Sequence, residues 1–206
     1  MLAPSWWILI VEDEADVVQS LLRTTPKRWR PVVAGSVAAA REMLEHRGVP
    51  MGAIVDLGLP DGTGLDLVDD IRRLDRELPI MVLTGQLTGD VINATNRMGA
   101  SYVCKPANAE NFQVFWQEVE AHEGHRLATA RTMGQQWGLT PRELETVVLA
   151  ASGVPRGRLS DVMGVSENTV KRHVNGVLTK AGMRTLSEVV WLLRKTVEEN
   201  ETAKID

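Results

Sequence analysis

Residues 54–64 read Ile-Val-Asp-Leu-Gly-Leu-Pro-Asp-Gly-Thr-Gly. The stretch begins with an apolar run that ends at the carboxylate of Asp56, and a turn-rich segment follows. Together with Ala53, the apolar residues indicate a short buried strand, and Asp56 stands at its carboxyl end. In open α/β sheets, ligands bind in the crevice beyond the carboxyl ends of the strands. We therefore expect Asp56 to face a ligand, and our hypothesis is that it accepts a phosphoryl group.

The alternation of strand and helix extends through the first part of the chain. Apolar runs predict strands, and apolar residues at helical spacing predict helices. The predicted strands are 6–11, 31–34, 53–55, 80–83 and 101–104, and the predicted helices are 15–22, 37–46, 65–74, 89–98 and 109–120. Such alternation predicts a parallel five-stranded sheet with helices on both faces.

Polar side chains follow four of these strands, and in a parallel sheet they gather at one edge. They are Glu12 with Asp13, then Asp56, Thr84 and Lys105. Three carboxylates that lie close together repel one another, and Mg²⁺ with its preference for oxygen ligands relieves this repulsion. A carboxylate can form an aspartyl-phosphate, while Mg²⁺ and a lysine neutralise the transferring phosphoryl group. The Thr84 hydroxyl can donate to a phosphoryl oxygen.

The length allows a single domain, but two soluble domains are the expectation, and the use of cysteine fits a reducing compartment. The chain has 206 residues, of which 44% are hydrophobic and 24% are charged, and its one cysteine, Cys104, excludes an internal disulfide. No apolar run approaches the ~18 residues that span a bilayer, and the N-terminus lacks the pattern of a signal peptide. We expect a cytoplasmic protein that does not bind membranes.

The charge is unevenly distributed along the chain. Residues 1–125 carry a net charge of −7, residues 126–197 carry +6, and the acidic tail, residues 198–206, carries −3. A basic second half is a candidate for contact with nucleic acid.

The second half of the chain predicts four helices. Thr140 is a candidate N-cap, Pro141 occupies the first helical position and Glu143 completes a capping box, so a helix begins there and ends at Gly153. Further helices are predicted over about 156–163, 167–181 and 186–197, and a Gly turn at Gly164 lies between the second and third.

The third of these helices carries a basic face opposite its apolar stripe. The polar face consists of Lys171, Arg172, Asn175 and Thr179. Helix, glycine turn and helix form the helix-turn-helix pattern, whose second helix enters the major groove of DNA. Arg and Lys suit guanine edges and Asn suits adenine. From these residues alone, a solvated basic face remains an alternative.

The first half resembles the receiver domain of two-component response regulators, a flavodoxin-like (βα)5 fold. The matching segments are 10–14 (Ile-Val-Glu-Asp-Glu), 55–64, 82–85 (Val-Leu-Thr-Gly) and 102–106 (Tyr-Val-Cys-Lys-Pro), within a resemblance over residues 6–121. The resemblance implies that Asp56 takes its phosphate from a sensor histidine kinase and that Lys105–Pro106 is a cis peptide. It also implies Mg²⁺ ligands at Asp13, Asp56, the Gly58 carbonyl and, through water, Glu12, and a switch pair formed by Thr84 and Tyr102.

The second half resembles the four-helix DNA-binding domain of LuxR-type regulators, of the NarL/FixJ subfamily when joined to a receiver. The matching segments are 139–145 (Leu-Thr-Pro-Arg-Glu-Leu-Glu) and 165–174 (Val-Ser-Glu-Asn-Thr-Val-Lys-Arg-His-Val). The resemblance implies base contacts by Lys171, Arg172 and Asn175, and places Thr169, His173 and Thr179 near phosphates or in packing. It points to dimerisation through the last helix, where Trp191 and Leu192 fall outside the apolar core face.

We therefore predict a receiver at residues 1–121, a linker at 122–137 and a helix-turn-helix domain with a short acidic tail at 138–206. The predicted protein is a homodimer-forming transcription regulator, not a turnover enzyme, that binds double-stranded DNA under control of Asp56 phosphorylation. The linker is either an extension of the last receiver helix or a flexible tether, and we assign His122 and His125 to its solvated surface.

Two other functions fit parts of the same pattern. The protein could regulate without phosphorylation, through protein contacts or through constitutive DNA binding. It could also be an aspartyl-phosphate phosphatase for small substrates, but such sites carry a second aspartate two residues after the nucleophile, where this chain has Gly58.

Overall fold

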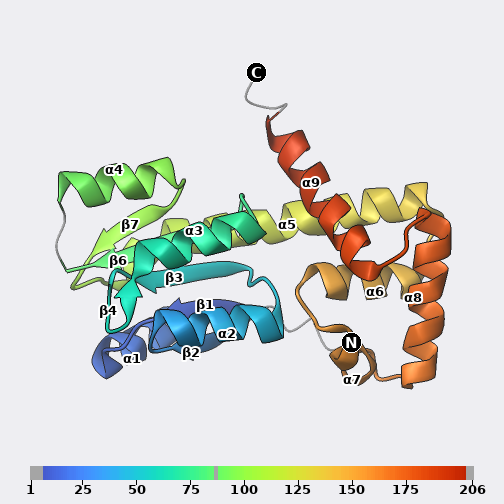
Figure 1. Cartoon of the computed structure of the whole chain (residues 1–206), viewed down its shortest axis with the longest axis horizontal. Helices are drawn as coiled ribbons and strands as arrows, with labels where there is room; N and C mark the ends of the chain where they lie inside the picture. The colour runs from blue at the N-terminus through green and yellow to red at the C-terminus, as the bar shows by residue number, and fades with distance from the viewer. Residues whose placement is uncertain (1–6, 86–87, 203–206) are drawn as a thin grey trace. The chain divides into compact units, whose positions relative to one another are not determined.

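A five-stranded parallel sheet forms the centre of the first half of the chain (Figure 1) in the computed structural model, which describes residues 7–85 and 88–202. The strand order is β2-β1-β3-β6-β7, and every neighbouring pair runs parallel. The bounds are β1 (Trp7–Val11), β2 (Arg30–Ala34), β3 (Gly52–Asp56), β6 (Ile80–Thr84) and β7 (Ser101–Cys104). The predicted fold class is therefore confirmed.

Helices separate consecutive strands of this sheet, as the sequence pattern predicts. They are α1 (Ala15–Thr24), α2 (Val37–Arg47), α3 (Gly64–Leu74) and α4 (Gly89–Arg97). Ser36 caps α2 by accepting a hydrogen bond from the Ala39 N–H at 3.1 Å. The helices α2 and α3 pack their apolar stripes into the buried cluster that includes Leu9 and Val55 of the sheet.

The central strands are buried along their full length because helices cover the sheet. Every residue of β1, β3 and β6 is buried. At Gly52 of β3, an added Cβ would lie 2.7 Å from Val119 Cγ2 and 3.1 Å from Phe115 Cζ. The glycine thus lets the first part of helix α5 (Gln113–Gln136) approach the strand closely.

A small antiparallel hairpin follows Asp56, where the sequence indicates only a turn. It pairs β4 (Gly58–Leu59) with β5 (Gly62–Thr63). The chain then returns so close to the strand end that a Cβ at Gly64 would lie 2.1 Å from the Asp56 carbonyl oxygen. Glycine at position 64 is therefore required for this return, since the contact is with backbone.

Helix α5 continues well beyond the predicted end of the last receiver helix. It follows the short 3-10 helix η1 (Ala109–Phe112) and runs to Gln136 without interruption. The described chain divides into two compact units, one up to His122 and one from Glu123 onward, and the division falls within α5. Of the two alternatives for residues 122–137, an extension of the last receiver helix is therefore the correct one. The domain boundaries at residues 121 and 138 stay a prediction.

The second unit is all-helical, as predicted. It comprises α6 (Pro141–Ala151), η2 (Arg156–Arg158), α7 (Leu159–Met163), α8 (Glu167–Ala181) and α9 (Leu186–Thr202), preceded by the end of α5. No helix within residues 7–85 and 88–202 combines the length and apolarity that crossing a membrane requires. The last residues of the predicted acidic tail, 203–206, lie outside the described residues.

The end of α5 belongs to the core of this second unit. Ala130 and Met133 are buried in the same cluster as Val147 of α6 and Val174 of α8. The buried Arg126 guanidinium donates a hydrogen bond to the Ala151 carbonyl at the end of α6. Residues that the sequence assigns to a linker thus contribute apolar and polar contacts to the helical unit.

Truncating Met133 should destabilise the second unit. We expect Met133→Ala to lower its free energy of unfolding by about 2–5 kcal/mol, the usual cost of removing a buried Met side chain. Urea denaturation followed by circular dichroism measures this loss. Gln135→Ala, an exposed position in the same helical turn, serves as the control, and equal stability of the two variants would contradict the packing of α5 into this core.

Candidate functional site

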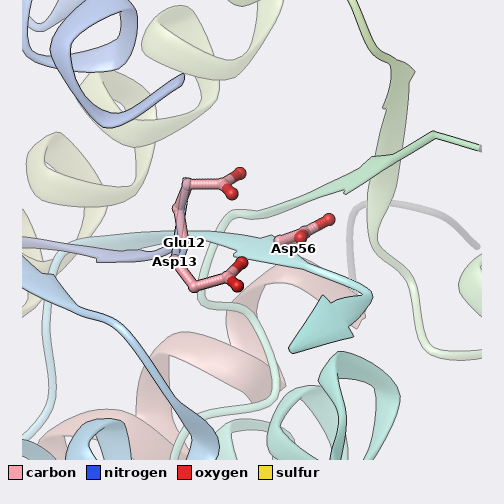
Figure 2. Close-up of side chains that lie close together, drawn as sticks. All are labelled: Glu12, Asp13 and Asp56. Atoms are coloured by element: carbon pink, nitrogen blue, oxygen red, sulfur yellow. The ribbon is translucent and has the colours of Figure 1, made fainter. Parts of the chain in front are cut away.

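The acidic cluster is built by the ends of two adjacent strands. β1 and β3 are parallel neighbours with Val11 opposite Val55, so the residues that follow them emerge at the same edge of the sheet. Carboxylate oxygens of Glu12, Asp13 and Asp56 all lie within 4.8 Å of one another. Figure 2 shows the Glu12 and Asp13 side chains extending toward the side on which Asp56 lies.

Lys105 reaches the same cluster from the end of β7. Its backbone N–H donates to the Thr84 carbonyl at 2.8 Å, and the Lys105–Pro106 peptide bond is cis, as expected. Its Nζ lies 2.8 Å from Glu12 Oε2 and 3.1 Å from Asp56 Oδ2. One ammonium group therefore pairs with both buried carboxylates of the cluster.

Burial and pairing together set the protonation behaviour of the cluster. Burial raises the pKa of Glu12, and the nearby Asp56 charge adds to this, while the hydrogen bond from Lys105 opposes it. Burial by itself would lower the pKa of Lys105, but its hydrogen bonds and charge attraction to Glu12 and Asp56 raise it above the ordinary 10.5. Lys105 is thus a permanent cation at physiological pH.

The three carboxylates fit a hard divalent cation. They offer only oxygen donors, two of the three are buried, and the single lysine only partly balances their charge. These are the properties of sites where Mg²⁺ binds through carboxylates while keeping several waters. The backbone at Gly58 lies close to the Asp56 carboxylate, as an added Cβ at Gly58 would be 3.7 Å from Asp56 Oδ2.

The predicted switch residues lie on the two neighbouring strands. Thr84 ends β6, next to β3 in the sheet, and is 4% exposed. Tyr102 stands opposite Val82 on β7 and is 37% exposed. The fold therefore brings Thr84 to the edge that holds Asp56 and leaves the Tyr102 side chain at the surface, and their roles stay a prediction.

Two acidic residues at this edge have contacts that the sequence did not reveal. The Asp61 carboxylate caps helix α2 by accepting hydrogen bonds from the Val37 N–H at 2.8 Å and the Ala38 N–H at 2.9 Å. The hydrogen bonds from Ala38 and Val37 lower the pKa of Asp61. Glu14 Oε1 lies 3.2 Å from Lys105 Nζ. No local pattern could have found either contact, because each joins segments far apart in the sequence.

His122 does not lie on a solvated linker, so that prediction is wrong. Its side chain is 6% exposed, and its Nε2 lies 3.7 Å from Asp75 Oδ2, at the end of α3. The reason is that α5 packs against the first unit up to this residue. His125 is exposed, as expected.

The second unit presents the predicted helix-turn-helix. α7 ends at Gly164, whose φ of +64° is the left-handed conformation that suits glycine, and Ser166 then caps α8 by accepting from the Thr169 N–H. Val170, Val174 and Val177 face the core. Four of the predicted DNA contacts are exposed, while Thr169 and His173 are half-buried; the exposed ones are Lys171, Arg172, Asn175 and Thr179.

A polar contact fixes α8 against α6. Glu143 completes the predicted capping box with Thr140, and its Oε2 lies 2.6 Å from Lys180 Nζ at the end of α8. A Cβ at Gly176 would lie 2.2 Å from Glu143 Oε1. The glycine in the middle of α8 therefore makes room for the buried carboxylate that aligns the two helices.

The predicted dimer residues on α9 differ in their surroundings. Trp191 is 62% exposed, and Lys195 Nζ lies 5.5 Å from its ring centroid. Leu192 is half-buried and packs against the core of its own unit. Trp191 is thus the more accessible of the two side chains.

A parallel sheet with an acidic cluster and a lysine at its carboxyl edge, followed by a helix-turn-helix unit, defines a receiver-containing DNA-binding regulator. The chain matches the family model of the response regulator receiver domain over residues 8–115 and that of the luxR family of bacterial regulatory proteins over residues 138–193. It therefore belongs to the response regulators of two-component systems that carry a LuxR-type DNA-binding domain.

Individual relatives agree with this assignment. The chain is 39% identical to the photosynthetic apparatus regulatory protein RegA of Rhodovulum sulfidophilum over 106 residues, which are 50% of this chain and only 57% of RegA. It is 26% identical to the nitrate/nitrite response regulator protein NarL of Escherichia coli (strain K12), covering 92% of this chain and 96% of NarL. This similarity along nearly the whole length agrees with the NarL/FixJ subfamily.

A solved structure shows the same fold for the first unit. A CheY-like response regulator receiver domain protein from Methanospirillum hungatei JF-1 has a TM-score of 0.53 at 20% identity, covering 58% of this chain and 97% of that chain.

The contact between Glu143 and Lys180 predicts a pH dependence of stability. Burial by itself would raise the pKa of Glu143, but hydrogen bonds from Lys180 and Thr140 outweigh it and hold the pKa below the ordinary 4.5. Folding therefore favours the ionised carboxylate, and this stabilisation is complete above about pH 4.5 and is lost as the pH falls through the lower, folded-state pKa. We expect Glu143→Gln to lower the free energy of unfolding by about 1–3 kcal/mol at neutral pH.

Denaturation of the wild type and Glu143→Gln between acidic and neutral pH tests this expectation, since the difference should shrink as the solution is acidified. Glu145→Gln is the control, because Glu145 pairs with Arg142 on the exposed side of the same helix. A difference that does not change with pH would show that the Glu143 charge is irrelevant.

Proposed function

We propose that Asp56 accepts a phosphoryl group from the phosphohistidine of a sensor histidine kinase and that this modification controls sequence-specific DNA binding. The observation that supports the proposal is the joint placement of Glu12, Asp13, Asp56 and Lys105 at one edge of the sheet. The reaction is a self-modification of the chain rather than turnover of a small substrate. A regulator that meets such a kinase and DNA acts in the cytoplasm.

The chain's own groups have distinct parts in the transfer. An Asp56 carboxylate oxygen forms a bond to phosphorus as the bond between phosphorus and the histidine nitrogen breaks, and the imidazole leaves with the bonding electrons. Lys105 stands 3.1 Å from Asp56 and neutralises charge on the transferring group. Asp13, Asp56, the Gly58 carbonyl and, through water, Glu12 would hold Mg²⁺, which supplies further positive charge when bound.

The signal then reaches the surface through the neighbouring strands. The Thr84 hydroxyl turns toward the new phosphoryl oxygen, and Tyr102, exposed at present, turns inward into the space that this movement frees. The face that carries Tyr102 changes shape, which favours a homodimer with two DNA-binding units on adjacent half-sites. In this proposal the exposed Trp191 contributes to the contact between the DNA-binding units.

Phosphorylation should tighten DNA binding. With acetyl phosphate and Mg²⁺, we expect the wild type to bind a selected DNA site about 5- to 150-fold more tightly, the usual range of coupling between two sites. Asp56→Ala should show no response. The DNA site is first selected from random sequences with the wild-type protein. Titrations of that site with each protein then measure the change in affinity.

Asp66→Ala is the matched control for that experiment, because Asp66 is an exposed aspartate in the first turn of α3. It should respond as the wild type does. Equal affinities of the wild type with and without acetyl phosphate would instead favour a regulator that works without phosphorylation.

The exposed face of α8 should carry the DNA affinity. If the Arg172 guanidinium contacts a base edge, we expect Arg172→Ala to weaken the free energy of DNA binding by about 1–3 kcal/mol and to relax the sequence preference at one base pair. Lys171→Ala should cost a similar amount at a neighbouring position. Binding to a set of single-base variants of the selected site measures both effects.

Arg131→Ala is the control for these variants, since Arg131 is exposed on α5 in the same unit. A loss of affinity in Arg131→Ala equal to that in Arg172→Ala would show that total charge, rather than the α8 face, determines binding.

A further inference from the structure

Lys105 has one more partner than the phosphoryl-transfer site requires. Its Nζ lies 2.8 Å from Glu12 Oε2, 3.1 Å from Asp56 Oδ2 and 3.2 Å from Glu14 Oε1. A lysine ammonium has three N–H donors and no acceptor. Three carboxylates thus surround the ammonium group, and Glu14 Oε1 accepts a hydrogen bond from it. A phosphoryl oxygen on Asp56 must compete with these carboxylates for Lys105.

The three carboxylates differ in how firmly they hold the lysine. The side chains of Glu12 and Asp56 are 0% and 6% exposed, whereas the Glu14 side chain is 63% exposed. Water screens an exposed ion pair, so it is weak. Glu14 is therefore the partner that Lys105 releases most easily when a phosphoryl group arrives.

Capping of its helix does not account for the position of the Glu14 side chain. Glu14 is the N-cap residue of α1, yet its side chain accepts no hydrogen bond from the first turn of that helix. Its backbone N–H donates to Glu12 Oε1 at 3.1 Å, which fixes residue 14 beside the cluster. The side chain accepts a hydrogen bond from Lys105 Nζ instead of from the first-turn N–H groups of its own helix.

We propose that Glu14 is a positioning residue that holds Lys105 in the unphosphorylated state and competes with the incoming phosphoryl group for it, so that it slows phosphorylation of Asp56. This inference rests on the proposed function of Asp56. With acetyl phosphate as donor, an Asp56 oxygen bonds to phosphorus as the bond from phosphorus to the acetyl oxygen breaks and acetate leaves. During this step the Lys105 ammonium leaves Glu14 and donates to a phosphoryl oxygen.

The test uses Glu14→Gln in the full chain, which keeps the size of the side chain and removes its charge. Phosphorylation by acetyl phosphate at saturating Mg²⁺, followed by intact-protein mass spectrometry, should be about two- to five-fold faster than in the wild type, the ratio that corresponds to one exposed ion pair. The rate of hydrolysis should change less, because Lys105 has already left Glu14 in the phosphorylated protein.

Asp16→Asn is the matched control. Asp16 is exposed in the first turn of the same helix, and among the described residues it forms no ion pair with Lys105. If Glu14 acts through Lys105, Asp16→Asn should phosphorylate at the wild-type rate. An equal acceleration of both variants would point to general repulsion of the anionic donor, and an unchanged rate of Glu14→Gln would likewise overturn the inference. A wild type that takes up no phosphate on Asp56 would instead disprove the proposed function.

Discussion

The first unit depends on the contact of one lysine with two buried carboxylates, whose charge it balances in part. As whole residues, Glu12 and Asp56 are only 1% and 4% exposed. Two adjacent negative charges in such a buried place are unfavourable without a cation. Lys105 supplies that cation from a strand that is distant in sequence. The requirement is met only if β1, β3 and β7 all present their carboxyl ends at the same edge, which a sheet of parallel strands achieves.

This arrangement also leaves the cluster incompletely balanced. One ammonium group faces the two buried carboxylates, with Asp13 close to them on the exposed side. The remaining negative charge attracts cations, and the Lys105 ammonium at 3.1 Å from Asp56 Oδ2 is the first of them. The same excess of negative charge therefore accounts for the contact with Lys105 and for the suitability of the cluster for a divalent ion.

The strands, the polar residues that follow them and several helix starts could be predicted from the sequence, because each depends on a local pattern. Apolar runs identify the strands, and the polar residue after each run falls at the carboxyl edge once the strands are parallel. The same is true of the helix starts at Ser36, Thr140 and Ser166, where a side chain caps its own helix. The positions of Asp56, Thr84 and Lys105 follow from these patterns.

Other features could not be predicted because tertiary contacts determine them. Asp61 caps a helix that begins 24 residues earlier, and nothing near either residue in the sequence indicates the pairing. The charged composition of residues 122–137 is compatible with a tether, and packing at His122, Arg126 and Met133 holds most of this segment in a helix. Glu14 is part of an acidic run in which no spacing distinguishes the residue that reaches Lys105.

Gly176 has a consequence for the design of regulators with new DNA specificities. Helix α8 carries the exposed residues Lys171, Arg172 and Asn175 on one side and, on the other, the space that Glu143 of α6 occupies. A recognition helix transplanted from another regulator would bring its own residue at this position, and any side chain there would collide with the carboxylate. A transplanted helix therefore keeps the contact between Glu143 and Lys180 in place only when it has glycine at this site or is moved together with its matching α6.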